Sequence, residues 1–384
     1  MKEITEVPFF RPSVGESEIA AVTECLRSGW LTTGPKTAEF ETAFANEFNS
    51  DVYCLAVTSA TAAMHLGLEA LGIGPGDEVI VPTLTFTATA EVVRYLGAEV
   101  VLVDIDPDTL CVSINEIEAA ITSRTRAIMP VHFAGRPCDM TRLRQLADAR
   151  DIKIMADAAH AFPASHSGRL IGECGAHATA FSFYANKTMT TGEGGMLVTS
   201  DPDIAGRART MRLHGIDRDV FNRFTDTQAS WIYDVVAPGY KYNMPDMAAA
   251  LGTVQLTRIH DFYMNRATRA KRYDNALANL PLILPPHAAN GDVHSWHLYI
   301  IQLTDDAPLD RDAFITALKS AGIGCSVHYR PLHQMTVWSH WNTEPSFPAA
   351  DRYGSRCVSL PLFMAMTDTE QESVIDVVTE IMSK

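Results

Sequence analysis

The sequence predicts an α/β fold in which helices sandwich a mostly parallel sheet, followed by a smaller α+β region. Between residues 53 and 157, short apolar segments alternate with helical segments, which is typical of a parallel sheet with crossover helices. Residues 180–200 interrupt this rhythm, because their Gly- and Thr-rich turn leaves no room for a crossover helix. The last third lacks the alternation, so we expect a large domain over residues 1–260 and a smaller one over 261–384.

Helix boundaries follow from capping signals and apolar periodicity. Ser13 and Glu16 resemble a capping box, and Gly29 is expected to end the helix that they begin. Residues 28–35 then form an exposed loop. Ser113 and Glu116 form a second capping signal. The other helices are expected at 37–48, 59–72, 87–96, 139–150, 201–213, 245–280, 310–321 and 367–383.

Strands are expected where short apolar runs end at turn residues. Residues 180–200 should hold an antiparallel pair or leave the sheet, since two strands joined by a short turn cannot be parallel. Ligands of an open parallel sheet lie outside the carboxyl ends of its strands. The other strands are expected at 53–57, 78–81, 100–103, 127–131, 152–156, 296–303 and 324–329.

Composition restricts the class of protein. A formal net charge of −15 over 384 residues opposes nonspecific binding to nucleic-acid phosphates. No segment approaches the apolar length of a membrane helix, and the first residues lack the pattern of a signal peptide. The seven cysteines are scattered without a CxxC pair, so neither a zinc site nor a disulfide framework is indicated. We expect a cytoplasmic protein that binds neither nucleic acid nor a membrane.

Three chemical features follow strands of the predicted sheet. The segment TSAT (58–61) joins a strand to a helix, and its small residues suit a phosphate at a helix start. Asp157 ends an apolar strand, and Lys187 follows the strand AFSF. Each has a simpler explanation, namely a helix N-cap, a cap of the next segment and a solvated surface lysine.

Together the three features describe a pyridoxal-phosphate site. A lysine in an apolar, partly cationic site has a lowered pKa and acts as a nucleophile toward an aldehyde. A carboxylate such as Asp157 pairs with a protonated pyridine nitrogen and makes the ring an electron sink. The backbone around Ser59, Ala60 and Thr61 would hold the phosphate.

Several long segments resemble the DegT/DnrJ/EryC1/StrS sugar aminotransferase family, which has the fold-type I architecture of pyridoxal-phosphate enzymes. One subgroup of the family is most similar, namely the enzymes that make UDP-4-amino-4-deoxy-L-arabinose for lipid A modification. The similarity to this subgroup lies in the variants GYKYN (239–243) and DAAHA (157–161) and in a WHL segment (296–298). The resemblance implies transfer of an amino group from glutamate to a nucleotide-linked keto sugar, in a homodimer with shared active sites. It lies in SGWLTTGP (28–35), residues 58–90, VHFAG (131–135), DAAHA (157–161), residues 181–197, HGID (214–217), residues 238–256 and SLPLF (359–363).

The resemblance also implies roles for single residues around the cofactor. Lys187 forms the Schiff base and shuttles a proton, while Asp157 pairs with the pyridine nitrogen. Phe86 stacks on the ring, unless it is a buried core residue. The remaining implied contacts are Ala60, Thr61 and Ser182 to the phosphate, His160 near the phenolic oxygen in place of the usual glutamine, and Lys241 or Asn243 reaching the neighbouring subunit's phosphate, or else forming an ordinary turn.

The expected sugar-binding residues come from two further segments. The early loop and the segment CSVHYRPLH line the substrate cleft in relatives. Arg330 would hold a diphosphate or the carboxylate of glutamate, with a structural salt bridge as the alternative. The histidines of HSWH (294–297) and of residues 333–341 match no recognised metal-ligand spacing, so we expect structural roles. The expected substrate residues are Trp30, Thr32, Thr33, His328, Tyr329 and Arg330.

Three other functions are compatible with parts of the pattern. A sugar dehydratase of the same family carries histidine in place of the lysine, which Lys187 argues against. A regulatory protein that keeps the fold has no need of Lys187 together with Asp157. A nicotinamide enzyme needs GxGxxG after a strand, whereas GIGPGDE (72–78) lies between a helix and a strand.

Overall fold

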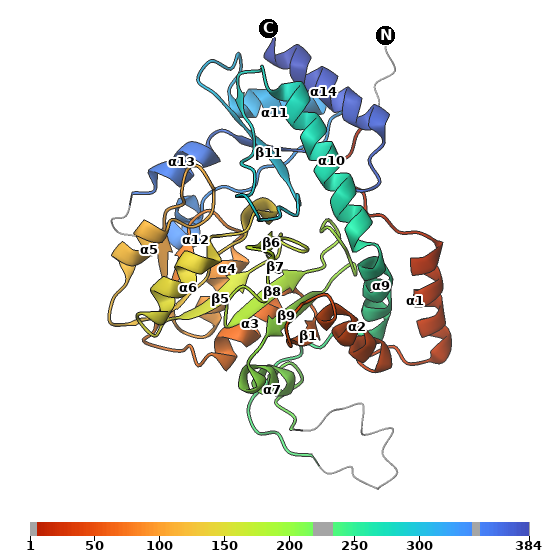
Figure 1. The fold of residues 1–384 in the computed structure, drawn as a ribbon, viewed down its shortest axis with the longest axis vertical. Helices are drawn as coiled ribbons and strands as arrows, with labels where there is room; N and C mark the ends of the chain where they lie inside the picture. The colour runs from red at the N-terminus through yellow and green to blue at the C-terminus, as the bar shows by residue number, and fades with distance from the viewer. Residues whose placement is uncertain (1–5, 218–232, 340–345, 384) are drawn as a thin grey trace.

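The computed structural model describes residues 6–217, 233–339 and 346–383 (Figure 1). Its main sheet has seven strands in the order β1-β9-β8-β5-β4-β2-β3. Strand β9 is antiparallel to both of its neighbours, and the other neighbouring pairs are parallel. The predicted α/β class and the antiparallel pair are therefore confirmed. The strands are β1 (Tyr53–Val57), β2 (Glu78–Pro82), β3 (Glu99–Val103), β4 (Thr125–Ile128), β5 (Lys153–Asp157), β8 (Ala178–Ser182) and β9 (Gly195–Thr199).

Helices cover both faces of this sheet because alternate residues of each strand point to opposite sides. On β1, Leu55 and Val57 pack in the apolar core beneath α3, whereas Cys54 and Ala56 pack in the core beneath α2. The first face carries α3 (Ala60–Ala70), α4 (Ala88–Tyr95) and α7 (Pro202–Met211). The second carries α2 (Pro35–Ala45), α5 (Ile114–Ala120), α6 (Met140–Asp148) and α9 (Asp246–Thr257).

A second, antiparallel sheet of three strands lies beyond the main sheet, with a core of its own. Figure 1 shows α10 running from beside α9 to the helices α11 and α14 over this small sheet. The boundary expected at residue 260 falls inside α10, and the division into two domains stays a prediction. The elements are β10 (Leu282–Ile283), β11 (Tyr299–Leu303), β12 (Cys357–Leu360), α10 (Ile259–Leu277), α11 (Arg311–Ser320) and α14 (Asp368–Met382).

The remaining elements are short or peripheral. They are α1 (Glu16–Ser28), the 3-10 turns η1 (Phe133–Gly135) and η2 (Leu332–Gln334), β6 (Ser165–His166), β7 (Arg169–Leu170), α12 (Thr336–Ser339) and α13 (Pro348–Gly354). Across the described ranges, no helix has the length and apolar character needed to cross a membrane.

Two local predictions are wrong for identifiable reasons. Gly15, not Ser13, caps α1, because the carboxylate of Glu18 accepts a hydrogen bond from the Gly15 backbone (2.9 Å). Residues 324–329 are not a strand; only Ser326 pairs there, in an isolated bridge with Ser359. The segment instead leaves the small sheet and carries its following residues toward the main sheet. Gly29, with φ 75°, ends α1 as expected.

Two further element boundaries differ between the sequence prediction and the structure. The helix expected over 245–280 is divided at Arg258 into α9 and α10. Strand β4 stops at Ile128 instead of Val131, although Val131 still forms a single bridge with Asp157.

The start of β9 lies directly against the start of α3. A Cβ atom on Gly195 would lie 2.4 Å from the carbonyl carbon of Ser59 and 2.6 Å from the nitrogen of Ala60. Only glycine fits at such a backbone approach. This contact brings the turn between β8 and β9, which carries Lys187, next to the first turn of α3.

Candidate active site

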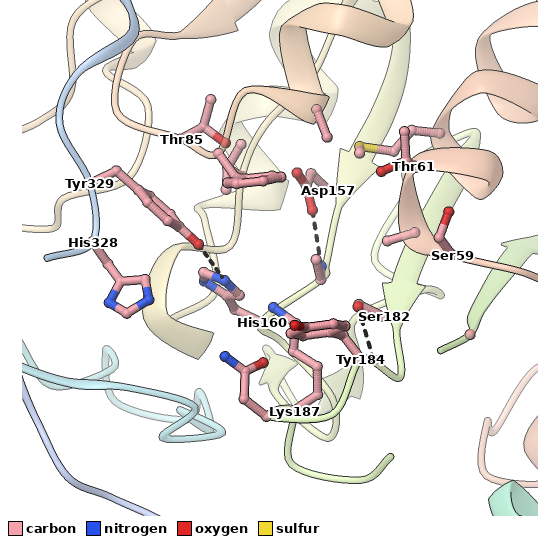
Figure 2. Close-up of a pocket in the computed structure, with 18 of the residues that line it drawn as sticks. Ser59, Thr61, Thr85, Asp157, His160, Ser182, Tyr184, Lys187, His328 and Tyr329 are labelled. Carbon is pink, nitrogen blue, oxygen red and sulfur yellow. Dashed lines mark hydrogen bonds between the residues drawn. The ribbon is translucent and has the colours of Figure 1, made fainter. Parts of the chain in front are cut away.

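A cavity of about 490 Å³ lies at the carboxyl ends of the central parallel strands, between the start of α3 and the turn after β8 (Figure 2). Side chains from the main sheet and from the segment before η2 face each other across it. Ten of the residues that the sequence predicted line this single cavity: Ser59, Ala60, Thr61, Phe86, Asp157, His160, Ser182, Lys187, His328 and Tyr329.

Lys187 belongs to the turn that joins β8 to β9, and its backbone N–H donates to the carbonyl of Tyr184 (3.0 Å). Burial lowers the pKa of Lys187 to about 8, and the negative charge of Asp157 opposes that change. About a tenth of the amine is therefore neutral at pH 7, far more than in an ordinary lysine, and the neutral form is the nucleophile.

Asp157 is the last residue of β5, and both of its carboxylate oxygens are held. One accepts from the backbone of Ala159 (3.0 Å), and the other accepts from the hydroxyl of Thr89 (2.8 Å). Burial raises the pKa of Asp157, while these hydrogen bonds and Lys187 favour the charged form. The simpler explanation, a cap on the next segment, accounts for one oxygen and leaves the contact with Thr89 unexplained.

The first turn of α3 opens toward the same cavity. Ser59 is its N-cap, with the hydroxyl accepting from the backbone of Ala62 (3.1 Å). The N–H groups of Ala60 and Thr61 have no carbonyl partner within the helix, because they precede its first complete turn. Ser182 lines the same cavity. This arrangement suits a phosphate group.

An aromatic wall faces these polar groups. Phe86 is 58% exposed, so the alternative that it is a buried core residue is wrong. Its ring centroid lies 5.9 Å from that of Tyr329. The Tyr329 hydroxyl lies 3.1 Å from Nε2 of His160. Burial, and then the positive charge of Lys187, hold the pKa of His160 well below its ordinary value, so the ring is neutral.

Three residues of the early loop lie outside this cavity, and the loop contacts the chain around Asn243, Met244 and Asp246. The Thr33 hydroxyl donates to the carbonyl of Met244 (2.6 Å) and accepts from the Asn243 amide (2.6 Å). Trp30 donates to the carbonyl of Thr33 (3.2 Å). Thr32 accepts from the backbone of Asp246 (3.3 Å).

The other three predicted residues also lie outside the cavity of this chain. Lys241 donates to the side chain of Asn243, so both belong to the same surface as the early loop. Arg330 is exposed, and its guanidinium donates to the carbonyl of Gln334 (2.5 Å).

Sequence reasoning missed several residues of the site. Asn186 and Glu193 line the cavity, and their nearness to Lys187 in the chain could have indicated them. The side-chain oxygen of Asn186 is buried with no hydrogen-bond partner in the described ranges. Thr89 contacts Asp157 from a different element, and nothing in its local sequence marks it. His297, expected to be structural, is buried and its ring centroid is 4.5 Å from that of His160.

Comparison with known proteins decides the family. Residues 12–379 match the sequence profile of the DegT/DnrJ/EryC1/StrS aminotransferase family. This chain belongs to that family. The aminotransferase is 43% identical to the spore coat polysaccharide biosynthesis protein SpsC of Bacillus subtilis, over 98% of this chain and 97% of SpsC.

Solved structures agree with this assignment. Spr1654 of Streptococcus pneumoniae, in its PLP form, has a TM-score of 0.90 and 34% identity, covering 99% of each chain. DesV of S. venezuelae, in complex with a ketimine intermediate, has a TM-score of 0.88 and 33% identity, covering 99% of each chain. The predicted cofactor, pyridoxal phosphate, and the fold-type I architecture are therefore confirmed.

The residues of the cavity fit this cofactor. The free N–H groups at the start of α3 suit its phosphate, and buried Asp157 suits a cationic ring nitrogen. Lys187 supplies a partly neutral amine for its aldehyde. The aminotransferase thus has, within one cavity, groups suited to the phosphate, the ring nitrogen and the aldehyde of the cofactor.

The lowered pKa of Lys187 predicts its reactivity in the cofactor-free protein. Only a neutral amine reacts with acetic anhydride, so a lowered pKa moves the rise in labelling to lower pH. Labelling of Lys187 should reach half its maximum near pH 8, with roughly a hundredfold more neutral amine there than an ordinary lysine has. Asp157→Asn should lower this midpoint further, because the charge of Asp157 raises the pKa of Lys187.

The measurement is trace labelling across a pH series, read by peptide mass spectrometry. Lys36 serves as the control in the same digests, because its ion pair with Glu39 raises its pKa. A midpoint for Lys187 as high as that of Lys36 would contradict the expected environment.

Proposed function

We propose that this protein transfers an amino group from glutamate to the keto group of a nucleotide-linked sugar, at carbon four of the sugar ring. The observation that carries the proposal is the convergence of Lys187, Asp157 and the start of α3 on one cavity. The family assignment supports amino transfer, and the name of SpsC refers to polysaccharide biosynthesis. The glutamate donor and the nucleotide-linked 4-keto substrate are our inference from the sequence segments of this chain.

In this proposal Lys187 has two tasks. Its neutral Nζ holds the cofactor through the aldehyde, and once released it moves a proton to and from the reacting substrate carbon. When bound, pyridoxal phosphate supplies the electron sink that stabilises negative charge on that carbon. A base must be neutral to accept a proton, which the pKa of about 8 for Lys187 provides.

The other cavity residues hold the cofactor in place. Asp157 pairs with the ring nitrogen, and the hydrogen bonds from Thr89 and Ala159 keep the carboxylate oriented. His160 would lie toward the phenolic oxygen of the cofactor, and Phe86 would pack on its ring. The phosphate contacts come from Ser59, Ala60, Thr61 and Ser182.

The sugar and its nucleotide contact two sets of residues. His328 and Tyr329 line the cavity of this chain, and we assign them to the substrate side. Trp30, Thr32, Thr33 and Arg330 lie outside it, so in this proposal they act at the rim or across a subunit interface. The GYKYN variant and His160 match the subgroup that aminates carbon four of UDP-linked sugars, and this match supports the position.

The alternative functions, a sugar dehydratase and a regulatory protein, place different requirements on the positions of Lys187 and Asp157. A sugar dehydratase of the family has histidine at the position of Lys187, and a regulatory protein has no use for a lysine with a lowered pKa beside a buried carboxylate. Both rivals are therefore disfavoured by the pair formed by Lys187 and Asp157.

The central prediction is that the cofactor is bound through Lys187. Purified protein should be yellow, and borohydride should fix the cofactor to Lys187 as found by peptide mapping. Lys187→Ala should keep the fold and melting behaviour but lose at least about a thousandfold of its transamination rate with glutamate. Mapping the label to a different lysine would overturn this assignment.

A homodimer with shared sites explains why Lys241 and Asn243 lie outside this chain's cavity. In a two-fold dimer, each subunit's GYKYN segment can reach the other's phosphate. Subunits carrying Lys187→Ala should therefore complement inactive subunits carrying Lys241→Ala with Asn243→Ala. Random mixing should restore about a quarter of wild-type activity, because half the dimers are mixed and each has one intact site.

Complementation is measured after unfolding and refolding the mixture, with mass spectrometry confirming that mixed dimers have formed. Each variant refolded alone is the control. An inactive mixture that contains mixed dimers would show that the two subunits do not share sites.

The position of amination is the third prediction for this function. The His160 imidazole, held by Tyr329, shapes one wall of the cavity, and reacting atoms tolerate little displacement. A UDP-linked 4-keto sugar should be aminated about tenfold or more faster than its 3-keto isomer. NMR of each product locates the new amine. Faster amination of the 3-keto isomer would contradict the position and leave amino transfer intact.

A further inference from the structure

The hydroxyl of Tyr329 points at another cavity residue, not at open space. It lies 3.1 Å from Nε2 of His160, and Figure 2 shows the two side chains meeting across one side of the cavity. Burial, and then the charge of Asp157, raise the pKa of Tyr329, so the phenol keeps its proton. Because His160 is also neutral, the bond joins two uncharged groups.

The His160 ring depends on this one hydrogen bond. Within the described ranges, the Tyr329 hydroxyl is the ring's sole hydrogen-bond partner, since Nδ1 is buried without one. Two further rings pack against it: His297, at 4.5 Å between centroids and tilted by 43°, and Phe133, at 6.3 Å. A tilted ring contact of this kind limits the space around the imidazole but does not fix its rotation as a directional hydrogen bond does.

Tyr329 is itself held from several sides. Its ring centroid lies 5.9 Å from Phe86 and 6.2 Å, edge-on, from Phe133. The residue before it is anchored as well: the Tyr353 hydroxyl donates to the carbonyl of His328 (2.8 Å), and the His328 ring lies 2.7 Å from the hydroxyl of Ser359. Packing against residues of the main-sheet region and the hydrogen bonds that anchor His328 therefore hold Tyr329 before any ligand enters.

We propose that Tyr329 is a positioning residue, which acts on the cofactor through His160 and not chiefly by touching the sugar. It holds the imidazole in one rotation at the cofactor's edge, and it links the segment after residue 324 to the chemistry on the main sheet. This role rests on the proposed function, because it takes His160 to face the bound cofactor. It differs from that function in assigning the Tyr329 hydroxyl a task that needs no substrate.

A double-mutant cycle on the full-length protein tests this proposal. The variants are Tyr329→Phe, which removes only the hydroxyl, His160→Leu, which removes both ring nitrogens, and the two combined. Tyr273→Phe is the matched control, because it removes a phenol hydroxyl that is also hydrogen-bonded, to the carbonyl of Pro361 (2.9 Å), but lies in the core of the small sheet. The readouts are the dissociation constant for pyridoxal phosphate and the visible circular dichroism of the bound cofactor, both without substrate.

Tyr329→Phe should weaken cofactor binding about threefold to tenfold, the usual effect of one neutral hydrogen bond, and should change the visible circular dichroism. In the His160→Leu background the same change should have no further effect on either readout. Tyr273→Phe should leave both unchanged, whatever it does to the melting temperature.

Other outcomes overturn the proposal. An equal loss from Tyr329→Phe with and without His160 would mean that Tyr329 acts independently of the histidine. No loss at all, or an equal loss from Tyr273→Phe, would likewise refute a positioning role. Failure of the proposed function is distinguishable, because it would appear as wild-type protein in which borohydride does not fix the cofactor to Lys187.

Discussion

The placement of Lys187 and buried Asp157 in one cavity is the constraint on which the rest of the site depends. Burial favours the neutral form of both groups, while their opposite charges favour the ionised forms. The balance leaves Lys187 with a pKa of about 8. A fully exposed lysine would be protonated and unreactive near neutral pH, and a lysine in contact with its carboxylate would be held as a cation. In the proposed function, the amine therefore needs both groups in one cavity without a tight ion pair.

The fold provides this arrangement through the antiparallel strand β9. A crossover helix after β8 would carry the chain away from the cavity, whereas the short return to β9 keeps Lys187 at the strand ends. The return also places Gly195 against the backbone of Ser59 and Ala60. A single topological feature thus brings the reactive lysine and the candidate phosphate site together, and Asp157 joins them from the neighbouring strand β5.

The small-sheet region completes the cavity from the other side. The segment after residue 324 joins β12 only at Ser326, and it then leads His328 and Tyr329 to the main sheet. A hydrogen bond to Ser359 holds that segment to β12, another from Tyr353 holds it to α13, and the Tyr329 hydroxyl holds it to His160. The cavity wall is therefore shared by segments about 170 residues apart in the chain, which couples the orientation of His160 to the packing of the small sheet.

The sequence by itself determined the class of fold and the residues with reactive groups. These can be recognised without knowledge of contacts, because they depend on local patterns in the chain. The patterns are the alternation of apolar and helical segments, the short turn in 180–200, and the order of TSAT, Asp157 and Lys187. Only the tertiary structure decided that Thr89 orients Asp157, that Tyr329 holds His160, and that the early loop packs on the GYKYN segment. The reason is physical: these contacts join residues from separate elements through single hydrogen bonds, which leave no periodicity or capping signal in the chain. The irregular path of residues 324–329 was missed for the same reason. Their apolar side chains suit a strand, and only packing between the two sheets prevents a regular strand from forming there.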